Sequence, residues 1–221
     1  MNSRTQSWAW VNAVAAVTAI AAIAACGAAS AQDNAFKLGV SEYTTNSKTN
    51  GVSGIGVPPG ADAETGNATT LLLVYERLLT PNIGAEFVLG LPPRLKAKAT
   101  GTVAFLGDDV LSAKIIAPTF LVNYHFGAPG DTWRPYLGAG VNYTRFVSTE
   151  SKLASDVKLG DSVGWAAQAG LDYTLTKEWG LFASVAALRV KSKLVATGST
   201  VLQTTIDFRP VVYSFGAFYR F

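Results

Sequence analysis

Apolar and polar residues alternate with a period of two over residues 162–175. One face of this segment carries large apolar side chains, including Trp165 and Leu171, whereas the other carries small or polar ones such as Gln168 and Asp172. A period of two is that of a β-strand, and this run is about twice the usual length of a soluble strand. The chain is therefore expected to contain long strands with one apolar face.

Seven further segments repeat this pattern less purely. The eight candidate strands are residues 36–43, 68–78, 83–98, 112–126, 133–147, 162–175, 179–194 and 204–221. Long connections alternate along the chain with the three short ones at residues 79–82, 127–132 and 176–178. This layout predicts an all-β protein, an eight-stranded antiparallel transmembrane β-barrel with long extracellular loops and short periplasmic turns.

The composition favours a membrane barrel over a helical membrane protein. Hydrophobic residues make up 49% of the chain and charged residues 15%. After residue 31, no apolar run approaches the roughly 18 residues that a membrane helix requires. A soluble lipocalin-type barrel is the alternative, but such a protein hides its apolar faces and does not need aromatic girdles.

Aromatic residues cluster beside the short turns and the C-terminal end, where a membrane barrel carries its periplasmic girdle. The predicted girdle consists of Tyr75, Tyr124, Phe126, Trp133, Tyr136, Tyr173, Trp179, Tyr219 and Phe221. The last strand alternates up to Tyr219 and Phe221, a pattern that resembles the signature recognised by the barrel-assembly machinery. These two residues are therefore the predicted assembly signature.

Residues 1–31 have the features of a cleaved signal peptide that precedes a barrel of residues 32–221. Arg4 is the only charge of this leader, an apolar stretch follows it, and Ala29, Ser30 and Ala31 form a small-x-small cleavage site. Two alternatives remain open at this stage. Cys26 lies in a sequence that resembles a lipobox, and the segment could also remain as an uncleaved anchor helix.

The faces of the strands suggest which residues line the interior. The candidates are Leu121, Ala117, Thr119, Asn123, Gly138, Gly140, Asn142 and Gln168. A charge that faces lipid costs about 2 to 4 kcal/mol, so Glu86, Arg94, Lys96 and Lys98 are also expected to point inward. Glu76, Glu86 and Arg220 form a candidate lumenal charge cluster near the periplasmic end.

Three prolines interrupt the candidate strands. Pro92 and Pro93 lie in the third and Pro118 in the fourth, and proline cannot donate to a β-ladder. A hairpin symmetric about Phe105 and Leu106 would place Pro93 opposite Pro118. The break either marks the point where the strands leave the bilayer or forms a lateral opening between lumen and lipid.

Several segments resemble the OmpW family of small outer-membrane proteins. They are LTPNIG at residues 79–84, RPYLGAGVNY at 134–143, the alternating run at 162–173 and FYRF at 218–221. The resemblance implies a barrel in the cell outer membrane with a narrow, partly apolar lumen that passes small hydrophobic molecules. The predicted partners are these solutes, outer-membrane lipid, lipopolysaccharide and the barrel-assembly machinery.

Other functions receive less support. An eight-stranded barrel can be filled by its own side chains, so a structural or interaction barrel without transport is the main alternative. An enzyme is not expected, because His125 is the only histidine and lies beside a short turn, where it is interpreted as an interfacial polar residue. No metal-ligand spacing, cofactor motif or clustered basic face for nucleic acid is found.

Overall fold

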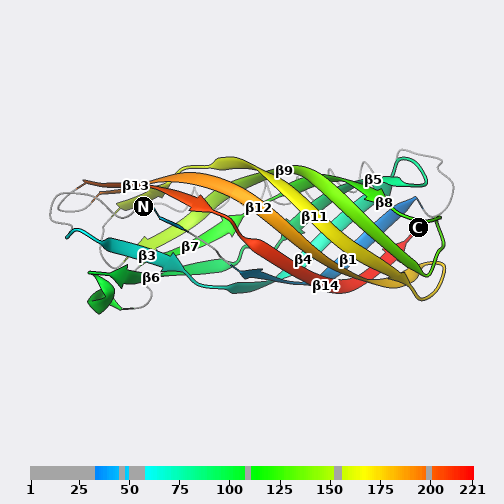
Figure 1. Ribbon diagram of the computed structural model, residues 1–221, viewed down its shortest axis with the longest axis horizontal. Helices are drawn as coiled ribbons and strands as arrows, with labels where there is room; N and C mark the ends of the chain where they lie inside the picture. Colours follow the sequence, from blue (N-terminus) through cyan, green and yellow to red (C-terminus); the bar gives the residue numbers. More distant parts are fainter. Residues whose placement is uncertain (1–32, 45–47, 50–57, 108–110, 152–155, 198–200) are drawn as a thin grey trace, which may run out of the picture.

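The structure, a computed structural model, describes residues 33–44, 48–49, 58–107, 111–151, 156–197 and 201–221, and the expected leader lies outside them. Its strands form a closed, elongated antiparallel barrel of eight strands, as predicted (Figure 1). The barrel strands are β1 (Asn34–Thr44), β4 (Ala68–Leu78), β5 (Ile83–Gly90), β8 (Thr119–His125), β9 (Trp133–Ser151), β11 (Ser162–Thr174), β12 (Trp179–Thr197) and β14 (Val211–Arg220). None of the described residues forms a helix that is long and apolar enough to cross a bilayer.

Pairing between the first and last strands closes the barrel. β1 lies antiparallel to β14, from Ala35 opposite Arg220 to Thr44 opposite Val211, and its other edge pairs with β4. The remaining barrel strands pair in chain order. A bilayer offers no water to unpaired peptide groups, and closure satisfies them within the sheet.

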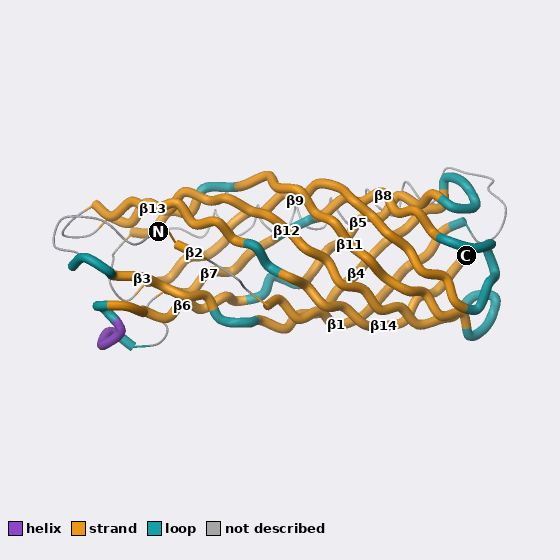
Figure 2. Tube along the Cα trace, in the orientation of Figure 1, coloured by secondary structure: helices purple, strands orange, loops and turns teal. Residues whose placement is uncertain are grey.

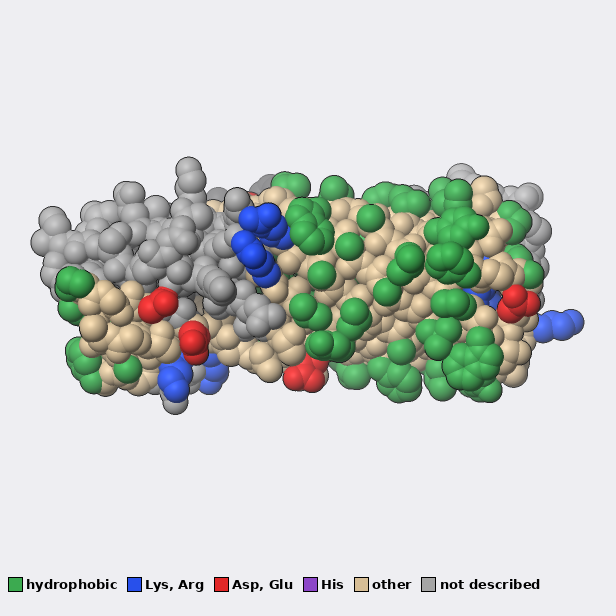
Figure 3. Space-filling view, in the orientation of Figure 1, with side chains coloured by type: hydrophobic (Ala, Val, Ile, Leu, Met, Phe, Trp, Pro, Cys, Tyr) green, Lys and Arg blue, Asp and Glu red, His purple; other side chains and the backbone are tan. Residues whose placement is uncertain are grey.

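The outward side chains of these strands are apolar and form a belt over the end of the molecule that holds the short turns (Figure 3). Val163 is 72% exposed and Leu38 63%, values expected of residues that face lipid rather than a protein core.

Aromatic rings gather at the end of this belt that includes the short turns. The pairs Phe36–Tyr75, Tyr124–Phe126, Trp133–Tyr173 and Trp179–Tyr219 have ring centroids 4.4 to 5.3 Å apart. One predicted girdle member is wrong. Tyr136 is 2% exposed, because it shares the inward face of β9 with Arg134 and Gly138.

Beyond the belt, the wall continues through segments expected to be loops and through the outer parts of three expected strands (Figure 2). The additional strands are β2 (Lys48–Thr49), β3 (Ala61–Thr65), β6 (Arg94–Gly101), β7 (Leu111–Ile116), β10 (Asp156–Leu159) and β13 (Val201–Phe208), with a short 3-10 helix at Ala104–Leu106. Strands outside a bilayer can face water on both sides, so they lack the apolar alternation that reveals barrel strands in a sequence.

Three of the predicted strands are each split at a proline. Residues 91–93 separate β5 from β6, residues 117–118 separate β7 from β8, and residues 209–210 separate β13 from β14. Interrupted pairing at Pro92, Pro93 and Pro118 follows from their missing N–H groups. The break at Pro210 was not part of that prediction.

The break at residues 91–93 reverses the face on which the following side chains lie. Glu86 points inward and is 3% exposed, as predicted, whereas Arg94, Lys96 and Lys98 are exposed. The predicted inward position of these three basic residues is therefore wrong. The irregular residues between β5 and β6 shift the alternation by one position. Figure 1 shows β6 at the end of the molecule opposite the apolar belt of Figure 3, where an outward charge is tolerated.

Tyr136 packs its ring over Gly170, its partner across β9 and β11, and a Cβ at position 170 would overlap the ring atoms. We expect Gly170→Val to lower the free energy of unfolding by about 1 to 3 kcal/mol, the usual cost of overpacking. Urea unfolding in detergent micelles, followed by tryptophan fluorescence, measures the change. Ala169→Val, on the exposed face of the same strand, is the control. Equal stabilities of the two variants would contradict this packing argument.

Candidate functional site

A cluster of buried ionic groups fills the barrel near its periplasmic end. Lys37 Nζ on β1 lies 3.0 Å from Glu76 Oε2 on β4 and 3.2 Å from Asp172 Oδ1 on β11. Glu86 Oε2 on β5 is 3.7 Å from the same ammonium. All four side chains are at most 4% exposed. Buried charges of this kind persist only when they are paired and hydrogen-bonded.

Two amides and a histidine complete the hydrogen bonding of the carboxylates. Asn123 Nδ2 donates to Glu76 Oε1 at 3.1 Å and to Glu86 Oε2 at 2.9 Å. Gln168 Nε2 donates to Glu86 Oε1 at 2.9 Å and to Asn123 Oδ1 at 2.8 Å. His125 Nε2 lies 2.7 Å from Glu76 Oε1. We call Lys37, Glu76, Glu86, Asn123, His125, Gln168 and Asp172 the polar plug.

Aromatic rings close the remaining part of the cross-section. Lys37 Nζ lies 4.7 Å from the ring centroid of Tyr136 on β9 and 5.6 Å from that of Phe182 on β12. On β14, Phe218 is 1% exposed and packs in the same core cluster as Phe182. Together with the polar plug, these three rings bring a side chain from each of the eight barrel strands to this level.

The sequence identified only part of this cluster. Glu76 and Glu86 were predicted to face the lumen as members of a charge cluster, and Arg220, the third, lies beside the plug with Nη2 3.9 Å from Asp172 Oδ2. Lys37 and Asp172 were missed as members of the cluster, although the alternation already places Asp172 on the polar face of residues 162–175. The interpretation of His125 as an interfacial residue is wrong, since it is 1% exposed.

Above the polar plug lies a mid-lumen cavity of about 570 Å³, a volume that includes open solvent. Most of its wall is apolar. The lining includes Leu72, Val74, Val88, Phe182, Leu188 and Val212, and also four predicted lumenal residues, Leu121, Ala117, Thr119 and Gln168. The chemistry of this lining suits an apolar solute.

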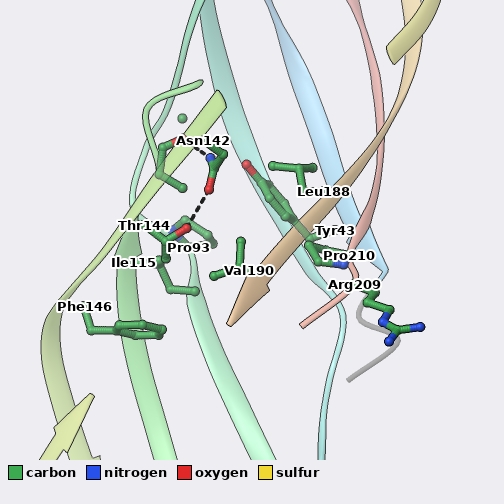
Figure 4. Close-up of a pocket in the computed structure, with 12 residues that line it drawn as sticks. Tyr43, Pro93, Ile115, Asn142, Thr144, Phe146, Leu188, Val190, Arg209 and Pro210 are labelled. Carbon is green, nitrogen blue, oxygen red and sulfur yellow. Dashed lines mark hydrogen bonds between the residues drawn. The ribbon is translucent and has the colours of Figure 1, made fainter. Parts of the chain in front are cut away.

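An outer cavity of about 710 Å³, again including open solvent, continues from the mid-lumen cavity. Tyr43, Ala117 and Leu188 line both, so the two spaces adjoin. Figure 4 shows Tyr43 extending between the wall with Pro210 and the wall with Asn142, while the guanidinium of Arg209 points away. The interior above the polar plug thus consists of two adjoining, mostly apolar cavities.

The remaining predicted lumenal residues lie on inward faces but have different surroundings. Asn123 is part of the polar plug, and Asn142 lines the outer cavity. Gly138 and Gly140 do not leave open space, because a Cβ there would meet Asn123 Oδ1 and the Phe120 carbonyl oxygen, respectively. These glycines allow β8 and β9 to pack closely rather than widening the lumen.

The proline break lies in the wall of the outer cavity. The ladder of β5 and β8 ends at Val88 opposite Thr119, and that of β6 and β7 begins at Arg94 opposite Lys114. Between them, across this fully described stretch, one backbone bond is found, from the Ile115 N–H to the Pro93 carbonyl at 3.3 Å. Gly90 and Pro93 on one side, and Ile115 and Ala117 on the other, line the cavity.

The predicted pairing of Pro93 with Pro118 is wrong. Pro93 lies opposite Ile115, so the hairpin is centred near Ala104 and not between Phe105 and Leu106. The short 3-10 helix at the hairpin tip sets this different register. The prolines nevertheless border the same interruption of the ladder.

Residues 31–221 match the model of the OmpW family. The chain is 35% identical over 161 residues to outer membrane protein W of Vibrio cholerae, covering 69% of this chain and 74% of that protein. It is 34% identical over 151 residues to the dibenzothiophene metabolism operon protein PahQ of Pseudomonas aeruginosa, covering 66% and 67%. The crystal structure of OprG from Pseudomonas aeruginosa superposes with a TM-score of 0.79 at 25% identity, covering 86% of this chain and 96% of OprG. The resemblance of the sequence segments and the barrel architecture thus have one explanation: this chain belongs to the OmpW family, and it is an outer-membrane protein.

Proposed function

We propose that this barrel passes small hydrophobic molecules from the cell surface into the outer membrane, with their exit at the proline break in its wall. One observation carries the proposal. The apolar interior is blocked at the polar plug but extends to residues on both sides of the break, including Pro93 and Ala117.

The polar plug disfavours passage to the periplasm. An apolar molecule that crosses this level would have to separate Lys37 from Glu76 and Asp172 without replacing their interactions. Breaking a buried ion pair in this way costs about 3 to 5 kcal/mol. A route that leaves the lumen above the plug avoids this cost.

The outer edges of the break suit an apolar solute. Leu91 is 60% exposed and Ile116 36%, and Pro92 beside them is also exposed. These side chains present no charge between the outer cavity and the lipid. A molecule that leaves between them would exchange one apolar environment for another, at little desolvation cost.

The name of one relative supports the class of solute. PahQ is named for a dibenzothiophene metabolism operon, and dibenzothiophene is a planar aromatic compound with little polar surface. We therefore propose apolar molecules of this general kind as solutes. No cofactor or enzymatic step belongs to the proposal.

A structural or interaction barrel without transport is the second candidate function. The observation that favours it is the band of exposed basic residues just beyond the apolar belt, including Arg94, Lys114 and Arg145. Their charge suits the phosphates of lipopolysaccharide. We propose lipopolysaccharide as a partner under either function.

Uptake measurements separate the two functions. Vesicles with lipopolysaccharide in the outer leaflet, with or without the barrel, are exposed to N-phenylnaphthylamine, whose fluorescence rises in apolar surroundings. Faster fluorescence increase with the barrel supports transport. Equal rates would favour the structural function.

Replacing Pro92 and Pro93 together with valine is expected to reduce uptake of the apolar probe. Valine restores two N–H donors and permits a longer ladder between β5 and β8. The same vesicle assay measures the rate per folded barrel. Pro129→Val, in a short turn at the opposite end, is the control. An unchanged rate in a folded double variant would rule out this exit.

Lys37→Met is expected to destabilise the barrel by about 3 to 5 kcal/mol. Three carboxylates would then lie around an apolar side chain, uncompensated in the buried lumen. Urea unfolding in micelles gives the free energy of unfolding, with Lys177→Met in an exposed turn as the control. A loss no larger than that of the control would show that the plug is not held by these ion pairs.

Phe221→Ser is expected to lower the amount of barrel in the outer membrane, because we propose that the barrel-assembly machinery recognises the final aromatic residues. The Phe221 ring also stacks on Phe36 at 5.4 Å. Immunoblots of membrane fractions measure the level, and Phe105→Ser at the exposed hairpin tip is the control. Matching levels of both variants would count against an assembly signature at Tyr219 and Phe221.

A further inference from the structure

The two edges of the proline break carry carbonyl groups that the barrel ladder does not pair. Pro92, Pro93 and Pro118 have no N–H groups, so acceptors outnumber donors there. Leu91 and Ala117 lie in the irregular residues on opposite sides of the break. Their carbonyl oxygens would be costly to leave bare, since an unsatisfied buried polar group costs free energy and lipid supplies no donor.

On the β5 side, the hydroxyl of Thr70 supplies the missing donor. Thr70 Oγ1 donates to the Leu91 carbonyl at 2.6 Å. The Leu91 N–H donates to the Leu71 carbonyl at 2.9 Å, so both backbone groups of Leu91 are satisfied from β4. Thr70 is 9% exposed, and the bond is made from the lumen side.

On the β8 side, the amide of Asn142 has the corresponding role. Its Nδ2 donates to the Ala117 carbonyl at 3.3 Å and to Thr119 Oγ1 at 2.7 Å. Thr119 Oγ1 in turn donates to the Ala117 carbonyl at 3.3 Å. Thr144 Oγ1 donates to Asn142 Oδ1 at 2.7 Å, which fixes the orientation of the amide, as Figure 4 shows.

We propose that Thr70 and Asn142 are positioning residues for solute exit: they satisfy the carbonyls at both edges of the break from the lumen side. This inference rests on the proposed function and adds to it the residues that keep the exit passable. Because the carbonyls already have protein donors, an apolar solute passes without stripping water from them. The edges also stay apart at Leu91 and Ala117, since Thr70 ties one carbonyl to β4 and Asn142 ties the other to β9; the bond that joins the edges is that from the Ile115 N–H to the Pro93 carbonyl.

A merely structural role would have a different signature. Loss of a stabilising hydrogen bond changes the unfolding midpoint but leaves the uptake rate per folded barrel unchanged. Loss of a positioning bond lowers that rate, because a bare or hydrated carbonyl then lies in the path. Rate per folded barrel and unfolding midpoint must therefore be measured together.

The test compares near-isosteric variants in the N-phenylnaphthylamine vesicle assay. Thr70→Val removes the hydroxyl, and Asn142→Leu removes the amide, each with little change in volume. We expect each to lower the initial uptake rate per folded barrel about tenfold, equivalent to about 1.4 kcal/mol. Thr70→Ser, which keeps the hydroxyl, should stay within about twofold of the unsubstituted barrel.

Ser41→Ala is the matched control. Ser41 is also buried in the lumen, where it lies opposite Thr70 in the ladder of β1 and β4, but its Oγ lies 2.8 Å from Ser214 Oγ on β14 and not against the carbonyls of the break. It should leave the rate unchanged. If Asn142→Leu fails to fold, the contrast between Thr70→Val and Thr70→Ser decides the inference.

Two negative results have different meanings. If the unsubstituted barrel takes up the probe no faster than barrel-free vesicles, the proposed function itself fails. If the unsubstituted barrel is active and folded Thr70→Val and Asn142→Leu match it, the function stands and the positioning role is overturned. Equal losses in Thr70→Val and Thr70→Ser would also overturn it, because the hydroxyl would then not be the relevant group.

Discussion

Every peptide group inside a bilayer must find its hydrogen-bond partner within the protein, and the rest of this structure depends on that constraint. It explains why the chain closes β14 on β1. It also gives the proline break its significance, since a ladder interrupted at the lipid face must be compensated elsewhere. The compensation comes from Thr70 and Asn142, two polar side chains that donate to the carbonyls of the break from the lumen side.

The polar plug follows from a second cost, that of burying charge. Lys37 is tolerated only because three carboxylates surround it, and those carboxylates in turn need Asn123 and Gln168 as donors. A buried network of this kind becomes costly when one of its charged members loses its partners. It therefore tends to a single, closed arrangement, which makes the periplasmic end the least favourable exit for an apolar molecule.

The sequence predicted the barrel because lipid imposes a pattern that can be read directly. Outward residues such as Leu137 and Val163 must be apolar at every second position, and this fixes the barrel strands within a few residues. Outside the bilayer that pattern disappears, so β3 and β10 were mistaken for loops. The faces predicted for Lys96 and Lys98 were wrong for a related reason. Alternation along a strand assigns faces only while the strand is regular, and the irregular residues at the break shift it by one position.

The site was harder to predict because its members come from different strands. Glu76 and Glu86 were assigned to the lumen from their own segments, but their shared contact with Lys37 requires the closed barrel. The register across the prolines was equally inaccessible, since it is set by the turn at Ala104–Leu106. Local periodicity identifies which face of a strand points inward, whereas a site depends on which inward side chains of different strands contact one another.

The polar plug blocks the axis of the barrel, and the proline break interrupts its wall. A break without a plug would leave a barrel open to the periplasm, and water and ions would pass along its axis. A plug without a break would leave an apolar cavity with no second opening. The outer cavity touches Pro93 and Ala117, while the mid-lumen cavity touches Lys37 and Glu86. An apolar solute that enters from outside therefore meets charge along the axis and apolar side chains at the wall, and desolvation directs it toward the wall.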